Sequence, residues 1–283
     1  MLKNLRDFGF KTDNKFYVIA EIGINHGGDL DKAKLLIDSA STTGVDAIKF
    51  QTYITENRVE KSSPIFDVLK ECELSLDKFE ILKRHTEQYG IEFMSTPFDK
   101  DSVECLDSLG VEIYKIASFD VNNHNLLRHI ADTGKTAVMS VGMSNLDEIR
   151  NAYNILREKT DKQAILHCIS AYPTKTSDAN LSAIYKLKDT FDCVIGQSDH
   201  TPGTNVPIVA AASGAQVLEK HYMIHEDFEC VDSPVSITEF QLKYLIQSLR
   251  ELERILGDGE MGIRDSEKGA TIFRRTSGQN EAR

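Results

Sequence analysis

The sequence predicts an α/β fold of the (β/α)8 TIM-barrel type, and three observations lead to this prediction. Short apolar runs alternate with amphipathic segments eight times along the 283 residues. The apolar runs are almost continuous in hydrophobic residues, as strands covered on both faces usually are. No G-x-G-x-x-G motif follows the first run, which disfavours the second candidate fold, a doubly wound open sheet.

The predicted strands and helices follow one another in strict alternation. The strands are residues 16–22, 47–51, 92–95, 112–116, 136–140, 164–168, 193–197 and 216–219. In the first helical segment Ala33, Leu36, Ile37 and Ala40 recur at the spacing of one helix face. The helices are residues 31–43, 77–89, 101–109, 125–133, 146–157, 181–189, 205–213 and 237–256.

This pattern predicts one catalytic barrel over residues 16–260. Residues 1–15 form a polar N-terminal extension, and residues 261–283 form a polar tail or linker. The connection over residues 53–76, after the second strand, is long, and long connections are typical of lids and binding loops.

Composition excludes several classes of protein. The formal net charge of -11, from 33 basic and 44 acidic residues, disfavours a nucleic-acid partner. The five cysteines are odd in number and lack C-x-x-C spacing, which is typical of a reducing compartment. The N-terminus lacks a signal-peptide core, and no apolar run reaches the roughly 20 residues that span a bilayer. We therefore expect a soluble, cytoplasmic protein without a membrane partner.

Two lysines stand out, because catalytic groups of a barrel lie where its strands end. Lys49 and Lys115 each lie in an otherwise apolar strand, where an unpaired charge is costly. For a single lysine of this kind, a structural ion pair is as good an explanation as a functional role. Two lysines with hydroxyl groups at the same edge favour a site for a phosphate or carboxylate, and Gln51 shares the strand face of Lys49. The hydroxyl residues are Thr96, Ser118, Ser140 and Ser198.

Two histidines end the last two strands. His200 and His221 leave neighbouring strands, which lie about 5 Å apart, so that both rings can reach one divalent metal ion. The alternative is a pair of hydrogen-bonded core histidines, and His26 and His167 remain competing ligands. Glu21, at the end of the first strand, is either a general acid/base or the ion-pair partner of a barrel lysine.

Nine short motifs, taken in order, strongly resemble the sialic acid synthase family of N-acetylneuraminate, legionaminate and pseudaminate synthases. The resemblance extends from about residue 16 to Arg274 and Arg275. The motifs are E-I-G-I-N-H at 21–26, K-F-Q-T at 49–52, S-T-P-F at 95–98, Y-K-I-A-S at 114–118, S-V-G-M at 140–143, L-H-C at 166–168, A-Y-P-T at 171–174, S-D-H-T at 198–201 and E-K-H-Y at 219–222.

The resemblance implies condensation of phosphoenolpyruvate with an N-acetylated amino sugar to give a nine-carbon 2-keto sugar acid and phosphate. It implies that His200 and His221 hold Mn²⁺, with Mg²⁺ or Co²⁺ as alternatives, which polarises the sugar aldehyde. Glu21, Asp232 and Lys49 are the implied catalytic residues. The implied phosphoenolpyruvate-binding residues are Lys49, Thr96, Lys115, Ser118, Ser140 and Ser198. The implied sugar-binding residues are Gln51, Asp120, Ser170, Tyr172 and Asp232.

The chain departs from the family pattern in three places. Asp120 stands where the family usually has glutamate, and Ser170 stands where it has asparagine. Family dimers also carry an antifreeze-like domain that lends an arginine to the partner subunit, and this chain ends at Arg283, about where that domain begins. Either the sequence is truncated before that domain, or this branch works without the arginine. In the second case we expect the 53–76 connection or the tail to cover the site, and a homodimer to use the barrel alone.

Two other functions fit the same residues. A Schiff-base aldolase would use Lys49 or Lys115 as its nucleophile. A non-catalytic barrel that binds sugars or anions would keep the binding residues without turnover.

Overall fold

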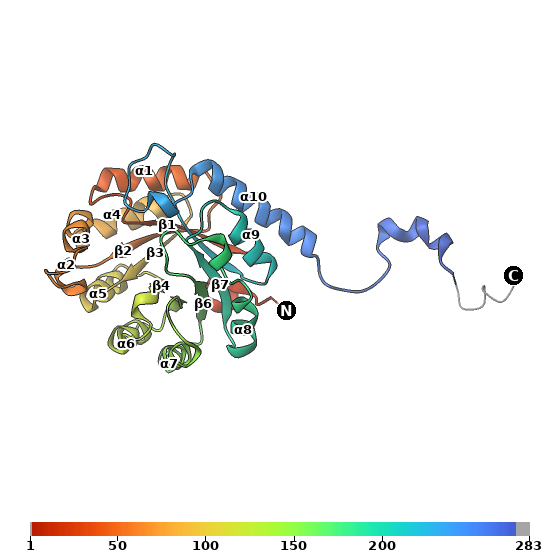
Figure 1. Cartoon of the computed structure of the whole chain (residues 1–283), viewed down its shortest axis with the longest axis horizontal. Coiled ribbons are helices and arrows are strands. Elements are labelled where there is room, and N and C mark those ends of the chain that lie inside the picture. The colour runs from red at the N-terminus through yellow and green to blue at the C-terminus, as the bar shows by residue number, and fades with distance from the viewer. Residues whose placement is uncertain (1, 276–283) are drawn as a thin grey trace.

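Eight parallel strands form a closed barrel in the order β1 to β8 (Figure 1). The computed structural model describes residues 2–275. Strand β1 also pairs with β8, where Glu21 lies opposite His221, and this pairing closes the sheet. The strands are β1 (Tyr17–Gly23), β2 (Ala47–Thr52), β3 (Glu92–Pro97), β4 (Ile113–Ile116), β5 (Thr136–Ser140), β6 (Gln163–Cys168), β7 (Val194–Asp199) and β8 (Val217–His221). The predicted (β/α)8 TIM barrel is confirmed.

Helices surround the barrel, and polar residues define where several of them begin. The Asp29 side chain caps α1, and capping boxes begin α7 at Asn145 and α10 at Thr238. The longer helices are α1 (Leu30–Ser41), α4 (Leu76–Glu87), α5 (Lys100–Ser108), α6 (His124–Asp132), α7 (Leu146–Arg157), α8 (Ala183–Thr190), α9 (Asn205–Ala212) and α10 (Glu239–Leu256). Short 3-10 helices are η1 (Leu5–Phe8), η2 (Ser118–Asp120), η3 (Thr176–Asp178), η4 (Ser233–Val235) and η5 (Asp265–Phe273).

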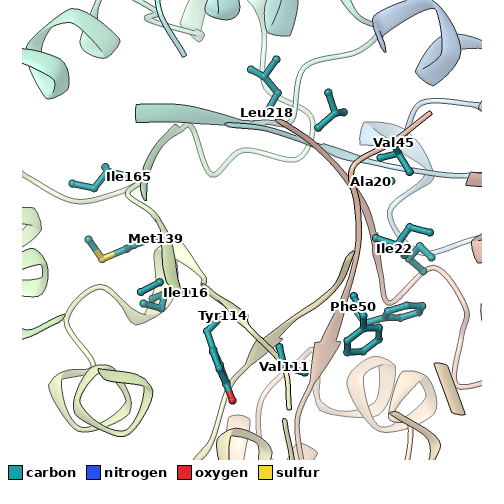
Figure 2. Close-up of a cluster of buried hydrophobic side chains, with 14 of the residues drawn as sticks. Ala20, Ile22, Val45, Phe50, Val111, Tyr114, Ile116, Met139, Ile165 and Leu218 are labelled. Carbon is teal, nitrogen blue, oxygen red and sulfur yellow. The ribbon is translucent and has the colours of Figure 1, made fainter. Parts of the chain in front are cut away.

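The period of two along each strand divides the core into an outer and an inner part. Outward side chains such as Ile22, Phe50 and Leu218 pack between the strands and the helices, as Figure 2 shows. The inward side chains of the lower barrel form a separate apolar cluster. Its strand residues are Tyr17, Ile19, Ala47, Met94, Ile113, Val138, Ala164, Leu166, Val194 and Val217.

The N-terminal segment completes this inner cluster. Leu5 and Phe10 belong to it, and the ring of Phe10 packs edge-on against Tyr17 with centroids 4.9 Å apart. The lower barrel is therefore filled mainly with apolar side chains. Apart from Glu92 and Thr136, which begin their strands, the polar inward residues lie nearer the C-terminal ends of the strands.

Several predicted element boundaries differ from the structure. Strands β3, β7 and β8 each continue two residues further, so that Ser198 and His221 lie within strands. Barrel hydrogen bonding extends them although all the added residues except Pro97 are polar. The predicted helix at 237–256 begins at Glu239, because Thr238 caps it. The connection over 53–76 contains two short helices, α2 (Thr55–Arg58) and α3 (Phe66–Cys72).

The segment after α10 extends away from the barrel (Figure 1). It contains η5, whose Ile272 and Phe273 are largely exposed. The last eight residues of the predicted tail, 276–283, lie outside the described part of the chain.

Across residues 2–275 we find no helix with the length and hydrophobicity needed to cross a membrane. All five cysteines are free thiols.

Candidate active site

A cavity opens at the C-terminal end of the barrel, and every strand contributes to its wall. The strand residues that line it are Glu21, Lys49, Gln51, Thr96, Lys115, Ser140, Cys168, Ser198, Glu219 and His221. The loops after the strands add Arg58, Phe98, Ala117, Ser118, Phe119, Tyr172 and His200. Because inward positions alternate along each strand, these polar groups form the layer directly above the apolar floor of the barrel.

Most residues predicted from the sequence lie in this wall, but Asp120, Ser170 and Asp232 do not. Each of the three lies beside a residue that does. Asp120 ends η2, which begins at Ser118, and the Ser170 hydroxyl lies 3.8 Å from the Cys168 thiol. Asp232 Oδ2 lies 3.3 Å from His221 Nδ1.

Both lysines are paired within a buried charge network. Lys49 Nζ lies 2.7 Å from Glu21 Oε2 and donates a hydrogen bond of 2.9 Å to Thr96 Oγ1. Glu219 lies between the lysines, with Oε2 3.7 Å from Lys49 Nζ and Oε1 3.4 Å from Lys115 Nζ. All four charged side chains are buried. The ion-pair interpretation of Lys49 and Glu21 is therefore correct, although both groups also face the cavity.

The two carboxyl groups of the network have opposite pKa shifts. Burial raises the pKa of Glu21, and the attraction of Lys49 offsets this only in part. Burial also acts on Glu219, but Lys115, Lys49 and the Ser198 hydroxyl lower its pKa to about 2. Two carboxyl groups with separated pKa values can divide the roles of proton carrier and fixed anion. Glu21 is the one suited to carry a proton.

The two lysines also differ. Burial would lower the pKa of Lys49, but Glu21 and Glu219 together raise it above its ordinary value. Burial lowers the pKa of Lys115, and Glu219 offsets only part of the effect. Lys49 is therefore held as a cation, whereas Lys115 loses its proton more easily.

His200 and His221 face one another above this network. Their ring centroids are 5.4 Å apart, and the ring of Tyr172 lies 4.1 Å from that of His200. His200 Nδ1 donates to the Ile169 carbonyl at 2.9 Å, and this tautomer follows because a carbonyl oxygen can only accept. His221 Nδ1 faces the Asp232 carboxylate. These partners leave the Nε2 lone pair of each ring available to a cation, as in carboxylate- or carbonyl-oriented metal ligands.

The residues present thus fit a divalent cation with two protein ligands. Within residues 2–275, no group of three or more histidine, cysteine, aspartate or glutamate side chains is arranged to hold a metal. A cation bound by His200 and His221 would complete its coordination with water or substrate oxygen, and such an open site is typical of catalytic metals.

The two competing histidines are outside the cavity wall. His26 Nδ1 accepts a hydrogen bond of 3.0 Å from the Gly28 amide, and its ring lies against Phe50. His167 follows an inward residue of β6 and therefore points outward, where Nε2 donates to the Ala179 carbonyl at 2.8 Å. Neither ring shares a site with His200 and His221.

Three polar side chains in the wall were not predicted from the sequence. Glu219 is two residues before His221, and Cys168 is two after Leu166, so strand alternation alone could have placed both inside. The Cys168 thiol lies 3.8 Å from His200 Nδ1. His200 and Lys115 keep the pKa of Cys168 below its ordinary value against the opposing effect of burial. Arg58 ends the short helix α2, in the connection after β2, and no sequence pattern indicated that it enters the cavity.

Comparison with known proteins places this site in context. The sequence model of the NeuB family matches residues 36–261. The chain is 41% identical over 262 residues to an uncharacterized protein of Methanocaldococcus jannaschii, covering 92% of this chain and 78% of that protein. It is 35% identical over 280 residues to the N,N'-diacetyllegionaminic acid synthase of Campylobacter jejuni, covering 93% of this chain and 84% of the relative.

A solved structure agrees with these matches. The crystal structure of the N-acetylneuraminic acid (sialic acid) synthetase of Leptospira borgpetersenii in complex with citrate superposes with a TM-score of 0.90 at 37% identity. The superposition covers 94% of this chain and 93% of that one.

Proposed function

The chain belongs to the NeuB family and is an enzyme of the sialic acid synthase type, and we propose that it joins phosphoenolpyruvate to an N-acetylated amino sugar. C3 of phosphoenolpyruvate attacks the open-chain sugar aldehyde, water adds at C2, and phosphate leaves. The product is a nine-carbon 2-keto sugar acid. One observation carries the proposal, namely that a single cavity holds both a lysine and hydroxyl cluster and a pair of facing histidines.

Phosphoenolpyruvate binds at the inner end of the cavity in this proposal. Lys49 and Lys115 supply positive charge, while Thr96, Ser118 and Ser198 supply hydroxyl groups. The buried Ser140 hydroxyl has no hydrogen-bond partner within residues 2–275, so that a ligand oxygen can take its hydrogen bond. The Ser118 oxygen accepts from the Gly142 amide at 2.9 Å, which leaves its proton to donate to the ligand.

The residues that would hold the metal and the acceptor sugar lie toward the outer end of the cavity. His200 and His221 would hold Mn²⁺ or a similar divalent ion such as Mg²⁺ or Co²⁺, which acts as a Lewis acid on the aldehyde oxygen. Asp232 holds the His221 ring in orientation from 3.3 Å. The sugar hydroxyls then meet the residues near the mouth of the cavity. These are Gln51, Asp120, Ser170, Tyr172 and Asp232.

Glu21 handles the proton in this scheme. Its Oε2 atom lies 2.7 Å from Lys49 Nζ, and its raised pKa makes the protonated carboxyl more accessible than in an ordinary glutamate. As the carbon–carbon bond forms, Glu21 gives its proton to the former aldehyde oxygen, which becomes a hydroxyl group. It recovers a proton from the water that adds at C2.

The test is phosphate release from phosphoenolpyruvate with a panel of N-acetyl and di-N-acetyl hexoses and Mn²⁺. We expect release with at least one sugar, its loss in excess chelator, and its return when metal is restored. Full activity in excess chelator would overturn the metal assignment.

Two outcomes would favour other functions. The lowered pKa of Lys115 is a property that Schiff-base lysines need, and borohydride trapping of pyruvate on Lys115 or Lys49 would favour an aldolase. Stabilisation by ligands with no phosphate release from any sugar would favour a non-catalytic binding barrel.

A further inference from the structure

Arg58 is the one cation of the cavity wall that the proposed reaction leaves without a role. It ends α2, in the connection that follows β2. Its guanidinium carbon lies 3.6 Å from the ring centroid of Phe98 and 4.7 Å from that of Tyr53, and Nη1 donates to Gln51 Oε1 at 3.1 Å. The side chain is therefore held in place by Gln51 of β2 and by the rings of two residues that directly follow β2 and β3.

The connection that carries Arg58 is itself well anchored. The Thr55 amide donates to Glu73 Oε2 at 2.7 Å, and the Ile54 amide donates to Asp99 Oδ2 at 2.9 Å. Tyr53 packs with Ile24, Leu69 and Cys72 in a small apolar cluster, and its hydroxyl donates to the Leu69 carbonyl. The guanidinium is thus positioned before any ligand arrives, which lowers the entropic cost of binding.

Arg58 has hydrogen-bonding capacity to spare. A guanidinium carries five N–H donors, and the structure gives Arg58 one hydrogen bond with the rest of residues 2–275. Burial lowers the pKa of Arg58, and Tyr53, Asp120 and Asp232 oppose this effect, so that the group stays charged at neutral pH. A partly buried cation with unused donors in a cavity wall is suited to a ligand oxygen.

The position of Arg58 assigns that oxygen to the acceptor rather than to phosphoenolpyruvate. Gln51, its hydrogen-bond partner, is two residues further along β2 than Lys49 and so lies nearer the mouth. The aromatic rings of Phe119 and Tyr172, both partly exposed, line the same cavity. The inner lysines already supply charge for the phosphate and carboxylate of phosphoenolpyruvate.

The negative charges near Arg58 indicate which chemical group of the acceptor it binds. The carboxylates of Asp120 and Asp232 act on the guanidinium of Arg58, so an incoming phosphate dianion would be repelled by both. A neutral acyl carbonyl suffers no such repulsion and accepts two N–H bonds, while its methyl group can pack on Phe98.

We propose that Arg58 binds the N-acyl carbonyl of the acceptor sugar and selects neutral, acylated acceptors. The proposal rests on the proposed function for the identity of the acceptor. It makes a residue of this chain's own second βα connection a determinant of specificity.

The experiment compares Arg58→Met, which keeps the packing on Phe98, with Arg58→Lys, which keeps the charge but not the planar group. Lys61→Met is the matched control, because Lys61 is an exposed cation of the same connection. We expect Arg58→Met to raise KM for the acetamido sugar about 10- to 100-fold, the range for a hydrogen bond to a charged group, and to change KM for phosphoenolpyruvate less than about twofold. Arg58→Lys should recover little, and Lys61→Met should match the wild type.

Calorimetric binding of N-acetylmannosamine and of mannose, with phosphoenolpyruvate and excess chelator present, separates this proposal from the turnover assay. Wild-type protein should prefer the acetamido sugar, and Arg58→Met should lose that preference while its unfolding temperature stays unchanged. This result supports the proposal even if no sugar gives phosphate release.

Three results would overturn it. One is an equal preference for the acetamido sugar in Arg58→Met and wild type, and another is a wild type that binds neither sugar. The third is a wild-type preference for a 6-phosphorylated sugar that Arg58→Met abolishes, because Arg58 would then be an anion-binding residue.

Discussion

The buried ion pair of Lys220 with Asp199 is predicted to contribute strongly to the stability of the site. Each of its two residues directly precedes one of the two histidines in the sequence. Lys220 and Asp199 are about 1% and 2% exposed, and Lys220 Nζ lies 2.7 Å from Asp199 Oδ2. Lys220 Nζ also donates to the Thr201 carbonyl, and the Thr201 hydroxyl donates to Asp199 Oδ2. The pair joins β7 to β8 on the outer face of the sheet, one residue before each histidine of the cavity.

The change Lys220→Met removes the cation and leaves a buried carboxylate. At an effective dielectric constant of about 20, two charges 2.7 Å apart attract by about 6 kcal/mol. Removing one partner of such a pair costs about 3–5 kcal/mol, because desolvation offsets part of the attraction. With about 2–4 °C per kcal/mol for a chain of this size, the unfolding temperature should fall by roughly 6–20 °C.

Urea unfolding followed by circular dichroism measures the loss. The control is Lys135→Met, since Lys135 pairs with Glu112 over the same 2.7 Å but the two side chains are 31% and 48% exposed. That exposed pair should contribute less than about 1 kcal/mol. The double variant Lys220→Met with Asp199→Asn should cost less than the sum of its single changes, because no unpaired charge stays buried.

The result that would refute this reasoning is equal destabilisation by Lys220→Met and Lys135→Met, or strictly additive costs in the cycle. A positional effect is expected beside the stability loss. Since Asp199 precedes His200 and Lys220 precedes His221, Lys220→Met should also weaken Mn²⁺ binding, measured by electron paramagnetic resonance below the unfolding temperature.

Three further predictions concern other parts of the molecule. Ser140→Ala should leave the free energy of unfolding unchanged, because its hydroxyl has no partner within the described chain, and should raise KM for phosphoenolpyruvate about 2- to 12-fold in steady-state assays. Phe10→Ala should cost about 3–5 kcal/mol in urea unfolding, since it removes a buried ring from the barrel floor beside Tyr17; a loss under 1 kcal/mol would count against that role. Hydrogen bonds from Thr55 keep the pKa of Glu73 below its ordinary value despite burial, so its stabilising effect is present above that ordinary value and is lost as pH falls through the lowered pKa. Amide protection factors over residues 53–76, which correct for the intrinsic pH dependence of exchange, should accordingly fall in acid in the wild type, and Glu73→Gln should show the lower protection already at neutral pH.

The barrel was predictable because its signal is local and repeated. Each strand is a short apolar run between turn residues, and each helix carries its own periodicity, so errors at single boundaries do not change the topology. The same period of two also assigns Lys49 and Gln51 to the inner face, as the structure confirms.

The connection over residues 53–76 was not predictable in the same way. Its order comes from contacts between residues distant in sequence, such as Thr55 with Glu73 and Ile54 with Asp99. Nothing in its composition indicates that α2 turns Arg58 into the cavity. The packing of the N-terminal segment into the barrel floor was not predictable for a similar reason. Phe10 fills a space that exists only when the barrel has closed.

The sequence by itself therefore determined the barrel and the set of polar residues at one end of it. Both follow from local periodicity, which each segment expresses without its neighbours. Only the tertiary structure decided which charges pair, which histidines share a site and which loop residue enters it. Those outcomes depend on distances across the barrel, where Lys49 meets Glu21 and Glu219 and where His200 faces His221, while His167 points to the other side of its strand.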